Sequence, residues 1–282
     1  MRVITSPHNP RVKLLRRLHE RRHRARTGLT LVEGWRAVDG LCRARAPIRE
    51  LWVAEGAEPP VAMASLEERL AGVPRTAVPW SVFRTFADTE TPQGVVAVVE
   101  VATVSLDHVL ARGPDGLLLI VDGVQDPGNG GALVRTAVAA GATGIVTTPG
   151  TVDLYGPRAL RGAAGLTPAC PLAPDVPRRQ LAAALAAAGV GVFVLDVAGV
   201  RSPFDVDWRG GRALVAGAEG GGAGPEWGEA GAERLRIPMR EPAESLNVAV
   251  SAGICLYEAA RQRGAFAGGS GGQLVGGSGA VL

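Results

Sequence analysis

The sequence predicts an α/β protein in two parts, a small N-terminal α/β domain and a larger C-terminal domain with a mainly parallel sheet. Its 282 residues exceed the length of most single domains, and 46% of them are hydrophobic, which is enough for a conventional core. After about residue 104, apolar runs typical of buried strands alternate with alanine-rich stretches typical of helices. We therefore expect domains at residues 1–103 and 104–263.

The first part opens with a basic helix predicted over residues 10–26, on which Val12 and Leu15 belong to one apolar face. Short runs of apolar residues follow, with a second helix predicted over residues 62–71. The strands of this part are expected at residues 29–32, 51–53 and 95–101.

The second part contains longer elements. Its strands are expected at residues 117–121, 144–147, 191–195, 212–216 and 234–238, and its helices at 130–140, 156–163, 177–188 and 246–262. The last helix is indicated by apolar residues that recur at helical spacing, namely Leu246, Val250, Ile254, Tyr257 and Ala260. In open parallel sheets the loops at the carboxyl ends of the strands bind ligands. Residues 264–282 are rich in glycine and serine and are expected to be a flexible tail.

Positive charge gathers at the N-terminal end. Residues 1–26 contain nine basic residues and one acidic residue, whereas the rest of the chain contains 21 basic and 26 acidic residues. Such a cationic run is expected of a protein that binds phosphates, so nucleic acid is the predicted partner. A solvated helix face rich in arginine is the alternative. The side chains expected to contact the nucleic acid are Arg11, Lys13, Arg16, Arg17, Arg21 and Arg22.

Several classes of protein are disfavoured. Lys13 is the only lysine and follows no glycine-rich turn, which argues against a Walker-type phosphate loop and against Schiff-base chemistry. Cys42, Cys170 and Cys255 are odd in number and far apart, so neither a disulfide framework nor a cysteine zinc site is indicated. Because the chain has no apolar stretch near the ~20 residues of a membrane helix and no secretory signal, we expect a soluble, cytoplasmic protein.

Three polar loops follow predicted strands and are the candidates for chemistry. The first, GVQDPGNGG at 123–131, leads into a helix, with Asn129 as the expected N-cap and Arg135 in the second helical turn. In the second, RALVAGAE at 212–219 is followed by glycines that would let a ligand approach the backbone. In the third, Ser245 and Asn247 open the last helix. Each loop alone is weak evidence of a site, but all three are expected at one end of one sheet.

The order and spacing of these segments resemble a known family. DPGNGGALVRTA (126–137), LVAGAEGGG (214–222) and IPMREPAESLNVAVSAG (237–253) closely resemble the three signature motifs of the SpoU (TrmH-type) RNA ribose 2′-O-methyltransferases. The resemblance implies a methyltransferase domain with a deep trefoil knot and homodimerisation through that domain.

The N-terminal part resembles the same family. SPHNPRVKLLRRL (6–18), GLTLVEGWRAV (28–38) and TPQGVVAVVE (91–100) are similar to its RNA substrate-binding domain. That domain type is more similar to those of relatives acting on large-subunit ribosomal RNA than to those of tRNA enzymes. Ribosomal RNA is therefore the expected substrate, tRNA is the alternative, and a role in antibiotic resistance is implied for some relatives. DNA is disfavoured because the acceptor is a 2′-hydroxyl.

The resemblance also implies S-adenosylmethionine as methyl donor, held in the knot largely by main-chain groups, and no metal. The implied cofactor-binding residues are Leu195, Gly217, Ala218, Ile237, Met239, Leu246 and Asn247. The implied catalytic residues are Asn129, Arg135, Glu219, Ser245 and Asn247. The sequence departs from the family at Ala218, where asparagine is frequent, and at Ala163, where the motif has serine.

The implied reaction is attack of a ribose hydroxyl on the methyl group of a sulfonium ion. Arg135 is the activator expected from the family, but a free guanidinium keeps its proton at neutral pH and makes a poor base. We therefore expect Arg135 to bind the phosphate of the target and to stabilise the developing alkoxide, with phosphate or solvent taking the proton. Asn129 and Ser245 would orient the ribose, while Asn247 and Glu219 would hold the loops.

Two other interpretations remain open. His19 and His23 flank Glu20 in a literal HExxH, the zinc-peptidase signature, and on one helix both imidazoles would face one side. The arginine-rich flanks oppose a divalent ion, and only His8 and His108 remain as further histidines. The other interpretation is an RNA-binding module without activity, against which the presence of the whole catalytic set argues.

Overall fold

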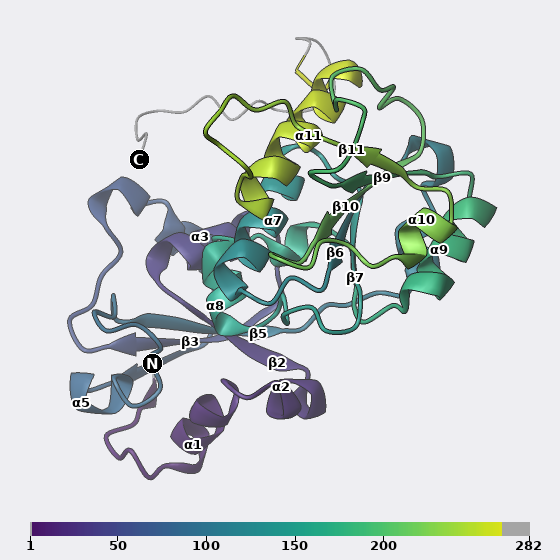
Figure 1. The fold of residues 1–282 in the computed structure, drawn as a ribbon. Helices are drawn as coiled ribbons and strands as arrows, with labels where there is room; N and C mark the ends of the chain where they lie inside the picture. Colours follow the sequence, from purple (N-terminus) through teal and green to yellow (C-terminus); the bar gives the residue numbers. More distant parts are fainter. Residues whose placement is uncertain (1, 267–282) are drawn as a thin grey trace.

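The protein contains two sheets that lie side by side (Figure 1). The structure, a computed structural model, describes residues 2–266. Most of the predicted glycine-serine tail, residues 267–282, lies outside the described residues.

The first sheet has five strands in the order β1-β4-β3-β5-β2. They are β1 (Arg2–Val3), β2 (Leu29–Glu33), β3 (Ile48–Ala54), β4 (Arg75–Val78) and β5 (Val95–Glu100). β5 runs antiparallel to both of its neighbours, while β3 and β4 are parallel. The helices around this sheet are α1 (Pro10–Arg17), α2 (Arg21–Thr27), α3 (Trp35–Arg43), α4 (Leu66–Arg69) and α5 (Trp80–Phe83). The three predicted strands of this part are confirmed.

The prediction of one basic helix over residues 10–26 is wrong, because the chain turns between α1 and α2. Glu20 adopts an extended conformation, with φ −90° and ψ 127°. The buried guanidinium of Arg24 donates hydrogen bonds to the carbonyl oxygens of Leu18 (2.9 Å) and His19 (2.8 Å). These bonds satisfy carbonyls that the end of α1 leaves unpaired, so a side chain from the next helix stabilises the break.

The helix predicted over residues 62–71 is also shorter than expected. It consists of a 3₁₀ turn at Val61–Met63 and the single-turn α4. Leu66 and Leu70 are buried and Met63 is half-buried against the same core, and so few buried side chains support little more than one turn.

The second sheet has six strands, all parallel, in the order β11-β9-β10-β6-β7-β8. They are β6 (Leu117–Asp122), β7 (Gly144–Thr147), β8 (Leu172–Ala173), β9 (Gly191–Leu195), β10 (Arg212–Gly217) and β11 (Glu233–Leu235). The predicted parallel sheet is confirmed. β11 is shorter than predicted, because the chain leaves the sheet after Leu235 and runs as a loop to Asn247.

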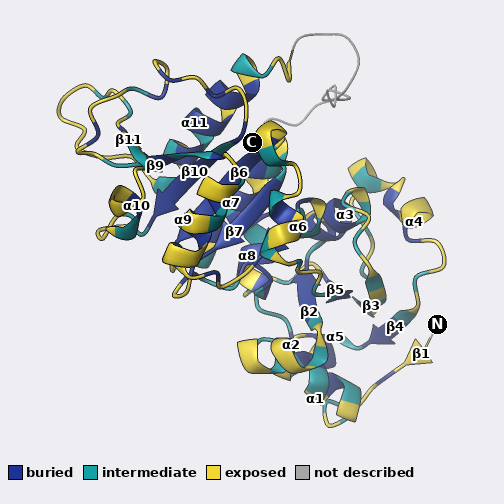
Figure 2. Cartoon of the chain, turned by 90° about the vertical axis from the view of Figure 1, so that its right-hand side faces the viewer, coloured by how far each residue is buried: buried dark blue, intermediate teal, exposed yellow. Residues whose placement is uncertain are grey.

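Helices cover this sheet on both faces, as Figures 1 and 2 show. The helices are α6 (Leu106–Leu110), α7 (Pro127–Ala139), α8 (Pro157–Gly162), α9 (Arg178–Ala187), α10 (Glu226–Glu229) and α11 (Val248–Gln262). Leu119 and Val121 of β6 belong to a core shared with α7, α8 and α11. Leu118 and Ile120 point the other way, into a core shared with α6, α9 and α10. The run of apolar residues in β6 reflects burial on both sides.

Most of the apolar stripe that indicated the last helix does not face the core, because Ala260 is the only one of its five residues that is buried. α11 buries mainly small residues, among them Ala252 and Ala259, against the sheet and α7. Val250 and Tyr257 lie on the outer side, with 52% and 46% of their surface exposed, and Leu246 precedes the helix. The helix was predicted correctly, but two of its large apolar side chains lie on its exposed side.

The two parts of the protein are packed backbone against backbone. A Cβ atom on Gly40 of α3 would overlap the carbonyl oxygen of Ala164, and one on Gly165 would overlap that of Ala37. Thr30 on β2 also donates a hydrogen bond to the carbonyl oxygen of Tyr155 (2.7 Å). Within residues 2–266, no helix is long and apolar enough to span a bilayer.

Candidate active site

A cavity of about 690 Å³ opens at the carboxyl ends of β9, β10 and β11. This is the edge of a parallel sheet where ligands are expected to bind. The predicted cofactor-binding residues that line it are Leu195, Gly217, Ala218, Ile237, Met239 and Leu246. Glu219 and Ser245 line it as well, so segments of two predicted motifs meet here. Asn247 is not among the lining residues and instead begins α11.

Gly217 permits the close approach of the backbone on one wall of this cavity. A Cβ atom at this position would overlap the backbone nitrogen of Ala223. Beyond Gly217 the chain makes a tight turn. In it the backbone amide of Ala218 donates a hydrogen bond to the carbonyl oxygen of Gly222 (3.0 Å), and the amide of Gly222 donates one to the carbonyl oxygen of Ala218 (2.8 Å). The glycine-rich sequence 217–222 therefore forms a compact wall of main-chain atoms.

A chain of side-chain hydrogen bonds joins all three signature segments. The Nδ2 group of Asn129 donates to the carboxylate of Glu219. The Nδ2 group of Asn247 donates to Oδ1 of Asn129 at 2.9 Å. Oδ1 of Asn247 accepts from the backbone amides of Ala249 and Val250, at 2.9 and 3.3 Å, and so caps α11. Residues far apart in the sequence thus meet beside the cavity.

The prediction that Asn129 caps α7 is wrong. Asp126 is the N-cap, and its Oδ1 accepts a hydrogen bond from the backbone amide of Asn129 at 2.7 Å. Because Asp126 caps the start of α7, the side-chain amide of Asn129 is free to bridge Glu219 and Asn247.

Of the predicted catalytic residues, Glu219 and Ser245 line the cavity, and Asn129 and Asn247 are joined to Glu219 beside it. Arg135 neither lines the cavity nor belongs to this chain of hydrogen bonds. α7 begins at Pro127, three residues earlier than predicted, so Arg135 lies in its third turn. Its side chain is exposed, is not among the residues lining the cavity, and makes no ion pair with any described residue. The neighbouring Thr136 packs against Gly253 of α11. Arg135 therefore lies beside α11, on which two large apolar side chains are exposed.

Two acidic residues near the cavity were not predicted. Asp196 lines it and pairs with Arg234 at 3.3 Å. Asp122, at the end of β6, is 1% exposed and holds several donors. Burial would raise the pKa of Asp122, but hydrogen bonds from Thr148, Gly224 and Trp227 lower it below its usual range. The signal in the sequence was an aspartate ending the apolar strand LLLIVD, which resembles any polar strand end.

The six predicted RNA-binding side chains fall into two groups. Arg11 forms an ion pair with Glu50, Arg21 pairs with Asp175 at 2.5 Å, and Arg22 pairs with Glu20 at 2.7 Å. Lys13 and Arg17 are exposed and Arg16 is half-buried. These three, all on α1, make no ion pair within residues 2–266. α1 packs on the face of the first sheet opposite α3, and Figure 2 shows α1 and α2 on the side of that sheet away from α11.

The HExxH motif does not lie on one helix. His19 follows α1, and its Nε2 is bonded to the carbonyl oxygen of Phe86 (2.9 Å). His23 lies within α2. Among the described residues no group of three or more His, Cys, Asp or Glu is arranged to hold a metal ion. The helical geometry on which the zinc-peptidase interpretation depended is therefore lacking.

Comparison with known proteins identifies relatives of both parts. The sequence model of the SpoU rRNA Methylase family matches residues 116–257, and that of the MRM3-like substrate binding domain matches residues 9–97. The 23S rRNA (guanosine(2553)-2′-O)-methyltransferase RlmP of Bacillus subtilis is 32% identical over 260 residues, covering 91% of this chain and 98% of the relative.

Two similar proteins have been solved with AdoMet bound. An AdoMet-bound rRNA methyltransferase from Sinorhizobium meliloti is 28% identical with a TM-score of 0.78, and covers 92% of this chain and 97% of its own. The SpoU methyltransferase AviRb from Streptomyces viridochromogenes, in complex with AdoMet, is 30% identical with a TM-score of 0.76, and covers 90% of this chain and 99% of its own.

Proposed function

This chain belongs to the SpoU family of RNA 2′-O-methyltransferases, and from that premise we propose that it methylates a ribose of large-subunit ribosomal RNA in the cytoplasm. S-adenosylmethionine is the methyl donor of the family. The observation that carries the proposal is the chain Glu219–Asn129–Asn247, which ties the three signature segments together beside the cavity. A ribosomal RNA substrate is supported by the names of relatives that match most of the chain.

The cavity suits S-adenosylmethionine in size and chemistry. Its volume of about 690 Å³ lies within the ~300–1,000 Å³ usual for ligand sites. Leu195, Ile237 and Leu246 offer apolar walls for a nucleobase, and the turn after Gly217 offers main-chain donors and acceptors. The Asp196 carboxylate suits ribose hydroxyls. The proposed cofactor-binding set remains Leu195, Gly217, Ala218, Ile237, Met239, Leu246 and Asn247.

The cofactor, when bound, supplies a methyl group on a sulfonium ion for an in-line displacement. The protein has to orient the ribose hydroxyl and stabilise the charge that develops on its oxygen. We assign Asn129 and Ser245 to orienting the ribose, and Glu219 and Asn247 to holding the loops in register. Arg135 supplies the positive charge for the alkoxide and for a phosphate of the target, and phosphate or solvent accepts the proton.

The domain organisation follows the same proposal. Residues 1–103 form the RNA substrate-binding domain, and residues 104–263 form the methyltransferase domain with the trefoil knot of the family. The ion pairs of Arg11, Arg21 and Arg22 favour Lys13, Arg16 and Arg17 as the α1 contacts to RNA.

Replacing Lys13, Arg16 and Arg17 together by glutamine is expected to weaken RNA binding and flatten its salt dependence. Each phosphate contact on single-stranded RNA adds about 0.7 to the slope of log K against log salt, so the slope should fall by about two. Binding titrations at several salt concentrations measure this. The control replaces Arg179 and Arg209 by glutamine and should leave the slope unchanged. Their side chains are 82% and 73% exposed and lie on the other domain. An unchanged slope in the α1 variant would remove α1 from the interface.

The outer side of α11 supports a homodimer. Val250 and Tyr257 are exposed, Tyr257 stacks on Phe266 with ring centroids 5.6 Å apart, and α7 with Arg135 lies alongside. An exposed apolar stripe on a helix of small buried residues fits a second copy of the same helix. We propose that two copies associate through α11.

The double variant Val250→Glu and Tyr257→Glu is expected to convert the dimer into a monomer, because it buries two charges in the proposed interface. Sedimentation velocity measures the change. Val197→Glu with Val200→Glu is the control, since both valines are exposed, at 61% and 94%, on a different loop. A dimer that survives the α11 substitutions would refute this interface.

The test of the activity is transfer of labelled methyl groups from S-adenosylmethionine to RNA transcripts. We expect incorporation into large-subunit ribosomal RNA and none into tRNA, with the label at a ribose 2′-oxygen. Incorporation into tRNA alone would mean that the substrate is tRNA and not ribosomal RNA. Tight RNA binding with no transfer to either RNA would favour a module without activity.

A further inference from the structure

Asp122 is a buried carboxylate with four hydrogen-bond donors. It ends β6, and 1% of its surface is exposed. Oδ1 accepts from Oγ1 of Thr148 at 2.5 Å and from Nε of Arg178 at 2.7 Å. Oδ2 accepts from the backbone amide of Gly224 and from Nε1 of Trp227, both at 2.9 Å. Both oxygens are therefore fully used.

These donors come from three separate segments. Thr148 follows β7, Arg178 begins α9, Gly224 lies in the connection from β10 to α10, and Trp227 lies in α10 itself. Asp122 is also the register neighbour of Gly217, the last residue of β10. Its carboxylate thus lies where β6, β7 and the glycine-rich turn come together.

The turn needs an anchor. Residues 218–223 and Pro225 line the cavity, and the turn from Ala218 to Gly222 is closed by bonds within itself. Consecutive glycines lose more conformational freedom on ordering than other residues, so such a turn is held only where it is tied to the rest of the fold. The bonds of Gly224 and Trp227 to Asp122 are such a tie, in addition to the bond between Asn129 and Glu219. Gly224 lies between the lining residues Ala223 and Pro225, and Trp227 lies two residues further on.

The backbone at Gly224 is closely packed against the side chain of Arg178. A Cβ atom on Gly224 would lie 2.6 Å from Cδ of Arg178, so the loop backbone is pressed against the same arginine that pairs with Asp122. A buried carboxylate is costly unless it is paired and bonded, and here Arg178 supplies the charge and three further donors complete the shell. An apolar residue would fill the same space but leave Gly224 and Trp227 without an acceptor.

We propose that Asp122 is a positioning residue that fixes the glycine-rich wall and thereby sets the affinity for S-adenosylmethionine without touching it. This inference rests on the proposed function, because it takes the cavity as the cofactor site. Loss of one hydrogen bond to the carboxylate should allow residues 218–224 to sample other conformations, and the ordering must then be repeated at each binding event.

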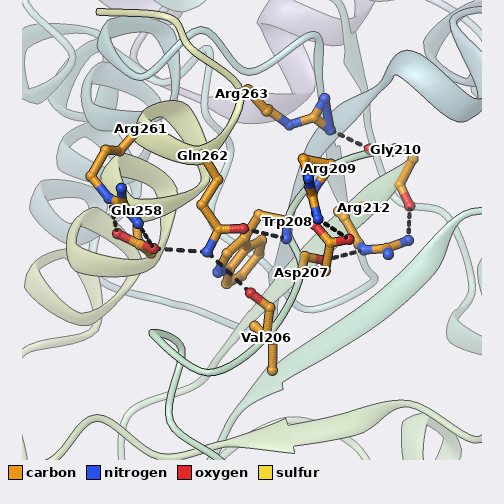
Figure 3. A network of polar contacts seen from close by, with 11 residues as sticks. Val206, Asp207, Trp208, Arg209, Gly210, Arg212, Glu258, Arg261, Gln262 and Arg263 are labelled. Carbon is orange, nitrogen blue, oxygen red and sulfur yellow. Dashed lines mark hydrogen bonds and ion pairs between the residues drawn. The ribbon is translucent and has the colours of Figure 1, made fainter.

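The test uses two variants and a matched control. Asp122→Asn keeps the shape but presents an amide to four donors, and Trp227→Phe removes one donor while keeping a ring in the core. Trp208→Phe is the control, because Trp208 is also fully buried and its Nε1 donates to the carbonyl oxygen of Pro203 at 2.8 Å. Trp208 lies in the polar network near the end of α11 (Figure 3), and it is not among the residues that line the cavity.

The dissociation constant for S-adenosylmethionine is measured by calorimetry, and amide hydrogen exchange of residues 218–224 is measured without cofactor. We expect Asp122→Asn and Trp227→Phe to bind about ten- to a hundredfold more weakly, the range for a hydrogen bond to a charged group. Exchange in the turn should rise in both variants. The Michaelis constant for RNA should stay within about twofold. Trp208→Phe should lower the melting temperature similarly but leave cofactor binding unchanged.

The outcomes separate this inference from the proposed function. If the native chain binds S-adenosylmethionine and Trp227→Phe binds it equally well, Asp122 is not a positioning residue. Equal weakening in Trp208→Phe would likewise overturn the inference, because the effect would then be general destabilisation. Failure of the native chain to bind the cofactor would overturn the proposed function itself. Trp227→Phe keeps the test decisive if Asp122→Asn does not fold.

Discussion

Arg135→Ala is expected to reduce methyl transfer by about a hundredfold or more while leaving the affinity for S-adenosylmethionine unchanged. Removal of a single group that stabilises developing oxyanion charge costs about 10²- to 10³-fold in rate. Arg135 is exposed on α7 and does not line the cavity, so its loss leaves the cofactor walls intact. Single-turnover transfer to RNA and cofactor calorimetry measure the two quantities.

The conservative variant and a surface control complete that experiment. Arg135→Lys keeps the charge but loses the two-pronged donor geometry, so it should recover only part of the rate. Arg179→Ala, on an arginine 82% exposed, should change neither quantity. A parallel loss of transfer and cofactor binding in Arg135→Ala would contradict a role for Arg135 in charge stabilisation.

Gly217→Ala should differ from Arg135→Ala in that it lowers the affinity for S-adenosylmethionine. The added Cβ would overlap the backbone of Ala223, so the turn that lines the cavity must shift. A displacement of about 1 Å at such a site can cost about 10²-fold, and we expect the cofactor affinity to fall by about that factor. Calorimetry measures the affinity, and binding of RNA by the variant shows that the N-terminal part remains folded.

Gly221→Ala is the matched control for this substitution. Gly221 lies in the same turn, but a Cβ there meets no atom within 4 Å. Its cofactor affinity should stay near that of the native chain. Equal losses in the two variants would mean that flexibility of the turn, rather than close packing at Gly217, governs binding.

The strands of the second sheet could be predicted because burial on both faces leaves a continuous apolar run, as in β6. The basic helix was predicted too long, because its break depends on Arg24 bonding to the carbonyls of Leu18 and His19 from the next helix. The spacing of apolar residues along the sequence does not predict such a contact. The outward orientation of Val250 and Tyr257 was invisible for the same reason, since spacing identifies a stripe but not what covers it.

The site was predicted only through whole motifs. Gly217 and Leu246 line one cavity, but a wall made of main-chain atoms leaves few side chains to recognise. Asn129 was taken for a cap because an asparagine near a helix start usually is one, whereas Asp126 has that role. Asp122 was missed because its four donors are supplied from segments 26 to 105 residues away.

The contact between α3 and the segment after α8 holds the two sheets at a fixed distance from each other. Where Gly40 meets Ala164 and Gly165 meets Ala37, main chain lies on main chain, and there is no side chain whose rearrangement would let the two sheets swing apart. An RNA bound on α1, as proposed, would then lie at a fixed distance from the proposed cofactor site. Under that proposal the choice of nucleotide would follow from this distance and from the shape of the folded RNA, so a change in the geometry of this contact should move the methylated position along the strand.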